Sequence, residues 1–103
     1  MLANRHGFAV DKGEARGIAL AQIDDLRRMR WGELRDRYLD KPETVEVRGA
    51  TGTTYQVQTQ ALWDSGKDGD LRIIVAVDDG GWRAFVPLSE DFILAPDGSF
   101  VGE

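Results

Sequence analysis

The sequence contains no cysteine, one histidine and three prolines among its 103 residues. Without cysteine the chain cannot form disulfides, thiolate nucleophiles or cysteine-ligated zinc sites. The longest purely apolar run, residues 73–77, is far shorter than the roughly 20 residues of a membrane helix. The N-terminal residues also lack the basic and then apolar layout of a signal peptide. We therefore expect a cytoplasmic protein with no membrane segment.

Residues suited to catalysis are few and badly placed. A nucleophilic mechanism needs a serine, threonine or cysteine beside a base, usually histidine. The only histidine, His6, lies in a segment with no periodicity, and the serines lie in expected turns: Ser65, Ser89 and Ser99. Paired carboxylates occur at Asp78–Asp79 and within 64–70, again in expected turns, where solvent favours ordinary pKa values. We assign no catalytic residue, and an enzyme using turn carboxylates is kept as an alternative.

Metal and cofactor motifs are also missing. The loop 64–70 (DSGKDGD) has carboxylates at the first and fifth positions and glycine at the sixth, as an EF-hand loop does. Its third position is Gly66, however, and its twelfth is Val75, where a bidentate glutamate is required. No glycine-rich phosphate-binding pattern is present. The sequence therefore predicts neither a metal site nor a cofactor.

Charge is distributed unevenly. Residues 1–42 carry a net charge of +2 and residues 43–103 a net charge of −7. The one basic cluster, 27–37, contains five arginines around Trp31 but also Glu33 and Asp36. We interpret it as a solvated, ion-paired helix surface, with an acidic protein partner and then nucleic acid as the alternatives. The acidic remainder would repel phosphate backbones, so nucleic-acid binding is not the expected function.

Hydrophobic periodicity changes once along the chain. We expect a flexible lead over 1–13 and a single domain over 14–103. Apolar residues at helical spacing predict helices over 14–28 and 31–39, the second ending before Pro42. Alternation then predicts strands over 44–48, 53–63, 71–78 and 82–88. The expected fold class is α+β, with N-terminal helices packed on a four-stranded antiparallel β-meander, and a curled, barrel-like sheet is the alternative.

Turn residues predict the strand register. Ala50-Thr51-Gly52 matches a three-residue hairpin loop and sets Val47 opposite Tyr55. Asp79-Gly80 is typical of a two-residue type I′ turn, which would require positive φ at Gly80. That turn would pair 73–77 with 82–86 and set Ile74 opposite Phe85. Beyond it we expect a helical turn over 89–93 and a short terminal hairpin around 96–98.

The register predicts the core and a second, outer sheet face. The expected core residues are Ile18, Ile23, Leu26, Leu34, Val45, Val47, Tyr55, Val57, Ala61, Leu71, Ile73, Val75, Val77, Trp82, Ala84 and Val86. The outer face would gather apolar and basic side chains among glutamines. Its candidate partner-binding residues are Leu62, Arg72, Ile74, Arg83 and Phe85.

A solvated face rarely needs isoleucine opposite phenylalanine, so we expect the outer face to be covered. The cover would be another part of this chain, a protein partner or a second copy in a homodimer. The leading hypothesis is a small, non-catalytic protein-interaction or regulatory module. An RNA-binding module that uses the same face, with Phe85, Arg72 and Arg83, is the second hypothesis.

Overall fold

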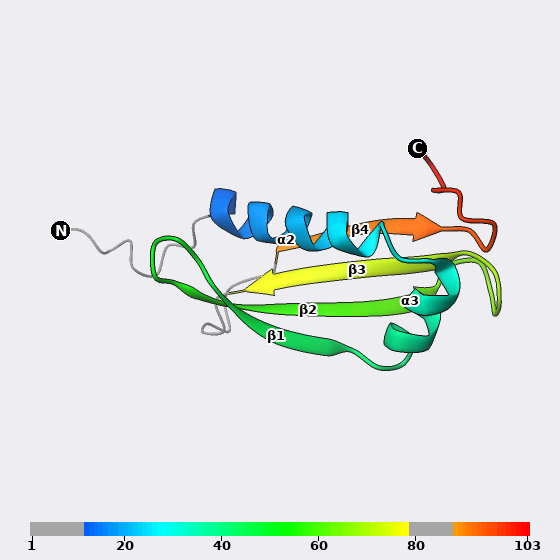
Figure 1. Ribbon diagram of the computed structural model, residues 1–103, viewed down its shortest axis with the longest axis horizontal. Coiled ribbons are helices and arrows are strands. Elements are labelled where there is room, and N and C mark those ends of the chain that lie inside the picture. Colours follow the sequence, from blue (N-terminus) through cyan, green and yellow to red (C-terminus); the bar gives the residue numbers. More distant parts are fainter. Residues whose placement is uncertain (1–11, 79–87) are drawn as a thin grey trace.

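Two helices and a four-stranded antiparallel sheet form an α+β fold, as the change of periodicity predicts. The computed structural model describes residues 12–78 and 88–103 (Figure 1). The strands follow one another in the order β1-β2-β3-β4, so the sheet is an open meander and not a closed barrel. The elements are α2 (Lys12–Leu26), α3 (Trp31–Tyr38), β1 (Glu43–Arg48), β2 (Thr54–Trp63), β3 (Leu71–Asp78) and β4 (Leu88–Leu94).

The helix boundaries differ slightly from the expected ones. The first helix begins at Lys12, two residues before Glu14, and ends at Leu26, so the last two residues of the expected lead are helical. The second begins at Trp31, where the backbone N–H of Arg30 donates to the Glu33 carboxylate at 2.9 Å. Residues 1–11 lie outside the described part of the chain. Among the described residues no helix is both long and apolar enough to span a membrane.

The first hairpin has the predicted turn and register. Gly52 has φ of 92°, which glycine adopts without a steric penalty. The Gly49 N–H donates to the Thr53 carbonyl at 2.7 Å, and Val47 lies opposite Tyr55. The pattern of a three-residue loop is therefore confirmed for β1 and β2.

The predicted fourth strand is wrong. The strand that pairs with β3 is Leu88–Leu94, so Val77 lies opposite Leu88 and Ile73 opposite Phe92. The expected pairing of 73–77 with 82–86 and the helical turn over 89–93 are both overturned. The segment 88–94 does not alternate in sequence, since three polar residues, 89–91, precede three apolar ones, 92–94. Its Phe92 and Leu94 are nevertheless buried in the core that α2 shares, a tertiary gain that local turn chemistry does not reveal. Residues 79–87, including the expected turn at Gly80, lie outside the described residues.

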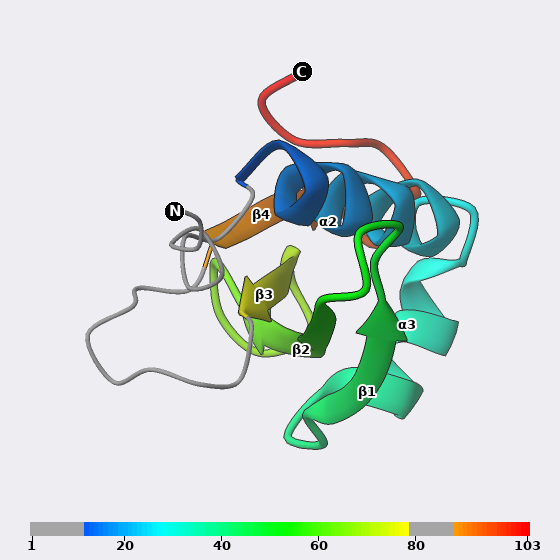
Figure 2. The ribbon, with the colours of Figure 1, turned by 90° about the vertical axis from the view of Figure 1, so that its left-hand side faces the viewer.

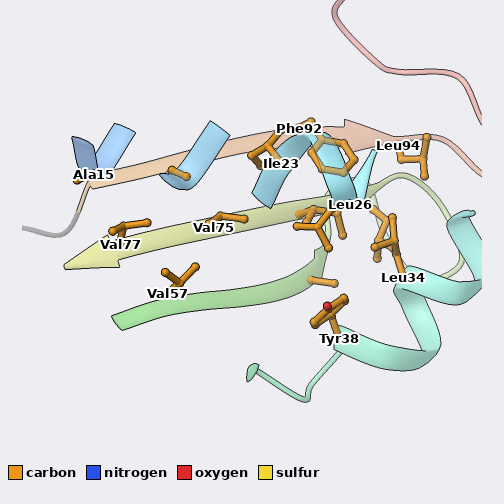
Figure 3. Packing of buried hydrophobic residues seen from close by; sticks show 14 of the residues in the cluster. Ala15, Ile23, Leu26, Leu34, Tyr38, Val57, Val75, Val77, Phe92 and Leu94 are labelled. Atoms are coloured by element: carbon orange, nitrogen blue, oxygen red, sulfur yellow. The ribbon is translucent and has the colours of Figure 1, made fainter. Parts of the chain in front are cut away.

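Both helices cover one face of the sheet. Helix α2 lies along β3 and β4, and α3 packs on β2 (Figures 1 and 2). Buried residues of α2, among them Ile23 and Leu26, face the strand residues Val75, Val57 and Phe92 (Figure 3). The core is therefore a single layer between two helices and one sheet face.

The core differs from the predicted one at its margins. The prediction that Val45 belongs to the core is wrong, because this residue is 47% exposed. Ile18 and Val47 are only partly buried. Trp82, Ala84 and Val86 lie outside the described residues. Buried residues that the predicted core omitted are Ala15, Ala19, Tyr38, Thr59, Phe92 and Leu94. All of these except Thr59 belong to the same apolar cluster as the helices and strands of the core.

Candidate interaction surfaces

The outer face of the sheet is the face opposite the helices. Leu62, Arg72 and Ile74 lie on it as predicted, because alternate residues of β2 and β3 point away from α2. The register adds Ile93 of β4 to this face. Arg72 of β3 lies between Leu62 of β2 and Ile93 of β4. No helix or strand of residues 12–78 and 88–103 packs on this face.

Two of the predicted residues cannot be placed there. Arg83 and Phe85 lie outside the described residues. The pairing of Ile74 with Phe85 is wrong in any case, because Ile74 lies opposite Gln60 on one side and Asp91 on the other. The apolar neighbours of Arg72 are therefore Leu62, Ile74 and Ile93.

The Arg72 guanidinium is held between two carboxylates. Its Nε and Nη2 donate to Asp64 Oδ1 at 2.9 and 2.8 Å, and its Nη1 pairs with Asp91 Oδ2. The hydrogen bonds that Arg72 donates to Asp64, and then to Asp91, raise the pKa of Arg72 further above its ordinary value. We call this arrangement of Leu62, Asp64, Arg72, Ile74, Asp91 and Ile93 the outer-face cluster. Its one cation is already neutralised.

The arginines of the basic cluster are paired in the same way. Four of them contact carboxylates, in the pairs Arg27–Glu103, Arg28–Asp25, Arg35–Asp36 and Arg37–Glu43. The Trp31 ring lies 4.9 Å from the Arg35 guanidinium, and its indole N–H donates to the Gly69 carbonyl at 3.1 Å. These contacts support the interpretation of an ion-paired helix surface.

A groove of about 310 Å³ lies on the helix side, between α2 and the edge strand β1. It exists because α2 follows β3 and β4 and leaves β1 without a helix above it. Its lining is mixed. The apolar part comes from Val45 and Val57 of the strands and from Leu26 and Tyr38 of the helices, and the charged part is Asp25, Arg37 and Glu43. The buried Thr59 hydroxyl, also in the lining, accepts a hydrogen bond from Gln22 Nε2 at 3.2 Å.

A second hollow, of about 440 Å³, lies between the end of α2, the start of α3 and the C-terminal hairpin. Arg27, Trp31 and Phe100 line it, together with one carboxylate, Asp97. That carboxylate accepts hydrogen bonds from the hydroxyl and the N–H of Ser99 at 2.7 and 2.9 Å, and the hydroxyl bond lowers the pKa of Asp97. Of the described residues that line this hollow, Asp97 is the one with a carboxylate, and that carboxylate is occupied by its own turn.

Glu14 connects the start of α2 to the first hairpin. Its carboxylate accepts hydrogen bonds from the Tyr55 hydroxyl at 2.8 Å, the Ala50 N–H at 2.8 Å and the Thr51 hydroxyl at 3.1 Å. The Tyr55 bond is the largest cause that holds the pKa of Glu14 below its ordinary value. This contact is structural, since the carboxylate is occupied by the turn that it positions.

The predicted turn residues take part in local bonds. Ser65 Oγ accepts a hydrogen bond from the Asp70 N–H at 3.1 Å, within the loop 64–70 whose spacing partly matches an EF-hand loop. Among the described residues no group of three or more histidine or acidic side chains is placed to hold a metal ion. His6 lies outside the described residues.

No family model, curated protein or solved structure matches this chain. The surfaces are therefore interpreted from their own chemistry. The sequence located the outer face by alternation, but it gave no sign of the groove beside β1. Only the lateral position of α2 over the sheet creates that groove, and periodicity does not record lateral position.

Proposed function

We propose that this protein is a non-catalytic protein-interaction module whose outer sheet face binds a protein partner. The observation that carries the proposal is the outer-face cluster: Leu62, Ile74 and Ile93 surround Arg72 on a face that no described helix or strand covers. Leu62 is 43% exposed. Covering apolar side chains from water contributes roughly 25 cal/mol per Å², so a partner that buries this cluster gains binding free energy.

The charge of the face indicates what kind of partner fits. Among the described residues the outer face and its cluster carry the acidic side chains Glu46, Asp64, Asp78 and Asp91 against the basic Arg48 and Arg72. A surface of this sign attracts basic groups and repels phosphates. The partner we propose is therefore a protein that presents apolar side chains ringed by lysine or arginine.

The same charges disfavour the alternatives. RNA binding on a sheet needs cations free to reach phosphates, whereas Arg72 is bound by Asp64 and Asp91. A face-to-face homodimer would bring two acidic surfaces together. An enzyme needs convergent carboxylates in a pocket, whereas the two that line the groove beside β1, Asp25 and Glu43, pair with Arg28 and Arg37, and Asp97 is bound by Ser99. With no cysteine to protect, the cytoplasm remains our proposed location.

The test compares two leucines of equal exposure. Leu62 lies in the outer-face cluster and Leu20 lies on α2, and each side chain is 43% exposed. Proteins captured from native lysate by the wild type would be identified by mass spectrometry, purified and titrated by calorimetry. We expect Leu62→Lys to weaken the dissociation constant of such a partner at least about tenfold, while Leu20→Lys leaves it within about twofold.

Circular dichroism should show that both variants stay folded. Recovery of RNA in place of protein, or equal binding by Leu62→Lys and the wild type, would refute the proposal. A wild-type dimer that becomes monomeric with Leu62→Lys would identify a second copy as the occupant and would also contradict the partner we propose.

A further inference from the structure

The outer edge of β1 offers free backbone hydrogen-bonding groups. In an antiparallel pair, residues alternate between those bonded to the partner strand and those whose N–H and C=O point away. The Gly49 N–H bonds to Thr53, which sets 49 and 53 as a bonded pair in the same register as the rest of β1 and β2. Residues 43, 45 and 47 therefore bond to β2. Thr44, Glu46 and Arg48 direct their N–H and C=O groups to the opposite, outer edge.

That edge is protected by charge alone, through Glu43, Glu46 and Arg48. Edge strands are commonly short or bulged, or carry proline or lysine, which prevents further pairing. β1 pairs with β2 in unbroken register over all six of its residues and contains neither proline nor lysine. At the other edge of the sheet the Ile93 carbonyl of β4 accepts the Val101 N–H at 2.9 Å. No comparable bond to β1 comes from any other segment in residues 12–78 and 88–103.

An exposed apolar side chain, Val45, lies beside the outer edge of β1. Val45 projects to the helix side, is 47% exposed and lines the groove between α2 and β1. A strand added along β1 would place every second side chain on the same face of the sheet as Val45. The one directly opposite Val45 would lie about 4.5–5.5 Å from it at Cβ. The added strand would thus gain backbone bonds and apolar burial together.

We propose that an extended segment of another protein binds along β1 as a fifth strand, with apolar and basic side chains alternating. Its apolar positions would face Val45 and the groove, and its basic positions would lie on the outer side beside Glu46. On that outer side β1 carries one carboxylate, Glu46, and one guanidinium, Arg48, and the rest of the described outer face adds Asp64, Asp78 and Asp91 against Arg72. Strand addition of this kind takes affinity from main-chain bonds and specificity from alternate side chains.

A second copy of β1 fits this edge less well. If two copies of β1 paired in antiparallel, the hydrogen bonds would have to join residues whose backbone N–H and C=O groups point outward. In each copy these are residues 44, 46 and 48. The most complete register sets Glu46 opposite its own copy, and like charges directly opposite are destabilising. Sliding by two residues in one direction sets Arg48 opposite Pro42, which has no N–H. Sliding in the other direction leaves only 46 and 48 paired within the two strands.

The test uses a fluorescein-labelled peptide of alternating Lys and Val, titrated by fluorescence anisotropy. Two variants differ at one backbone group: Thr44→Pro removes an outward N–H without changing charge, and Thr44→Val keeps it. Because the Thr44 N–H is not used by β2, proline there leaves the β1–β2 bonds intact. We expect Thr44→Pro to weaken binding at least about tenfold and Thr44→Val to change it less than about twofold.

Two controls do not depend on folding of the proline variant. A peptide of the same composition, with its valines in one block and its lysines at the ends, should bind at least about tenfold more weakly. The alternating peptide with N-methyl groups on the backbone nitrogens of one of its edges should also bind at least about tenfold more weakly. Leu62→Lys should bind the peptide as the wild type does, because the outer-face cluster is a separate surface. The calorimetric test of the outer face and the peptide test of the β1 edge can therefore fail independently of each other.

Equal binding of the alternating and blocked peptides would show attraction by charge alone and would overturn the proposal. Unchanged binding by the N-methylated peptide would do so as well. Light scattering that finds a wild-type dimer, made monomeric by Thr44→Pro, would assign the edge to a second copy of this chain and reject the extended segment of another protein.

Discussion

Val45 and Val75 are the same residue type on the same face of the sheet, yet their surroundings differ. Val75 in the central strand β3 is 0% exposed beneath α2, and Val45 in the edge strand β1 is 47% exposed. Burial of a methyl group contributes about 0.8 kcal/mol, and a cavity left by its removal adds to the loss. The lateral position of α2, and not the residue type, decides what each valine contributes.

Alanine substitution at these two positions should therefore give unequal results. We expect Val75→Ala to lower the free energy of unfolding by about 1.5–3 kcal/mol. Val45→Ala should change it by less than about 0.5 kcal/mol. Urea denaturation followed by circular dichroism measures both. A loss at Val45 as large as that at Val75 would show that β1 is covered in solution and that the groove beside it is closed.

The arginines of residues 27–37 show how far residue chemistry was predictable. The nearby acidic residues Glu33 and Asp36 suggested ion pairs, and Arg35 does pair with its neighbour Asp36, whereas Glu33 accepts the Arg30 backbone N–H. Arg28 pairs with Asp25, three residues before it. The partner of Arg27 is instead Glu103, at the far end of the chain. Local spacing can predict a pair three or four residues apart, but it has no means to predict a pair that the tertiary fold creates.

At the scale of elements, the central strands were predictable and the fourth was not. The sequence of β2 alternates, β3 contains the longest apolar run, and the Gly52 turn sets their neighbour β1. For the fourth strand two segments compete. The Asp-Gly pair at 79–80 favours the nearer one, 82–86, whereas 88–94 has its polar residues first and its apolar residues last and lacks the alternation typical of a strand. The pairing with 88–94 buries Phe92 against α2, so the choice between the two segments depends on helix packing and is absent from the strand pattern.

That error also altered the predicted site. With β4 at Leu88–Leu94, the cross-strand neighbours of Ile74 and Arg72 become Asp91 and Ile93. The outer face therefore gains a carboxylate where the sequence interpretation placed an aromatic ring. The change weakens the case for nucleic acid and strengthens the case for a basic protein partner.

The C-terminal hairpin is an element held by one aromatic side chain. Phe100 packs edge-on against Phe92 with ring centroids 5.9 Å apart, and the Arg27 guanidinium lies 3.8 Å above its ring. The predicted turn is confirmed, since Leu94 pairs with Phe100 across a turn in which Gly98 has φ of 91°. Aromatic pairs contribute about 0.5–1.5 kcal/mol beyond the area that they bury.

Removing that ring should loosen the hairpin. We expect Phe100→Ala to lower the free energy of unfolding by about 1–3 kcal/mol and to increase amide exchange at Val101, whose N–H bonds to Ile93. The neighbouring Val101→Ala, at a side chain 39% exposed, should stay within about 0.5 kcal/mol. Calorimetry and hydrogen exchange measure the two effects. Faster exchange without loss of stability would mean that Phe100 orders the hairpin but adds nothing to the core.

At the scale of the whole molecule, carboxylates join segments that the chain separates. Glu14 joins the start of α2 to the first hairpin, and Glu103 joins the C-terminal residues to the end of α2 through Arg27 at 2.7 Å. The Arg27 hydrogen bond holds the pKa of Glu103 below its ordinary value, as Tyr55 does for Glu14 and Ser99 does for Asp97. Both ends of α2 are therefore anchored through ionised groups.

These shifts predict how stability depends on pH. A carboxyl group whose pKa is lower in the folded state stabilises that state fully above its ordinary pKa, about 3.9 for aspartate and 4.3 for glutamate. The stabilisation is lost as pH falls through the lowered folded pKa, because protonation then removes the favoured charged form. The combined variant Glu14→Gln, Asp97→Asn and Glu103→Gln should melt at a lower temperature than the wild type at pH 7. Below about pH 4 the two melting temperatures should converge.

A control with the same charge change, Asp25→Asn, Asp36→Asn and Asp40→Asn, lacks these bridging contacts and should stay closer to the wild type at pH 7. Thermal melts by circular dichroism from pH 7 to pH 3 would check this, and a gap that widens in acid would contradict the anchoring role of the three carboxylates.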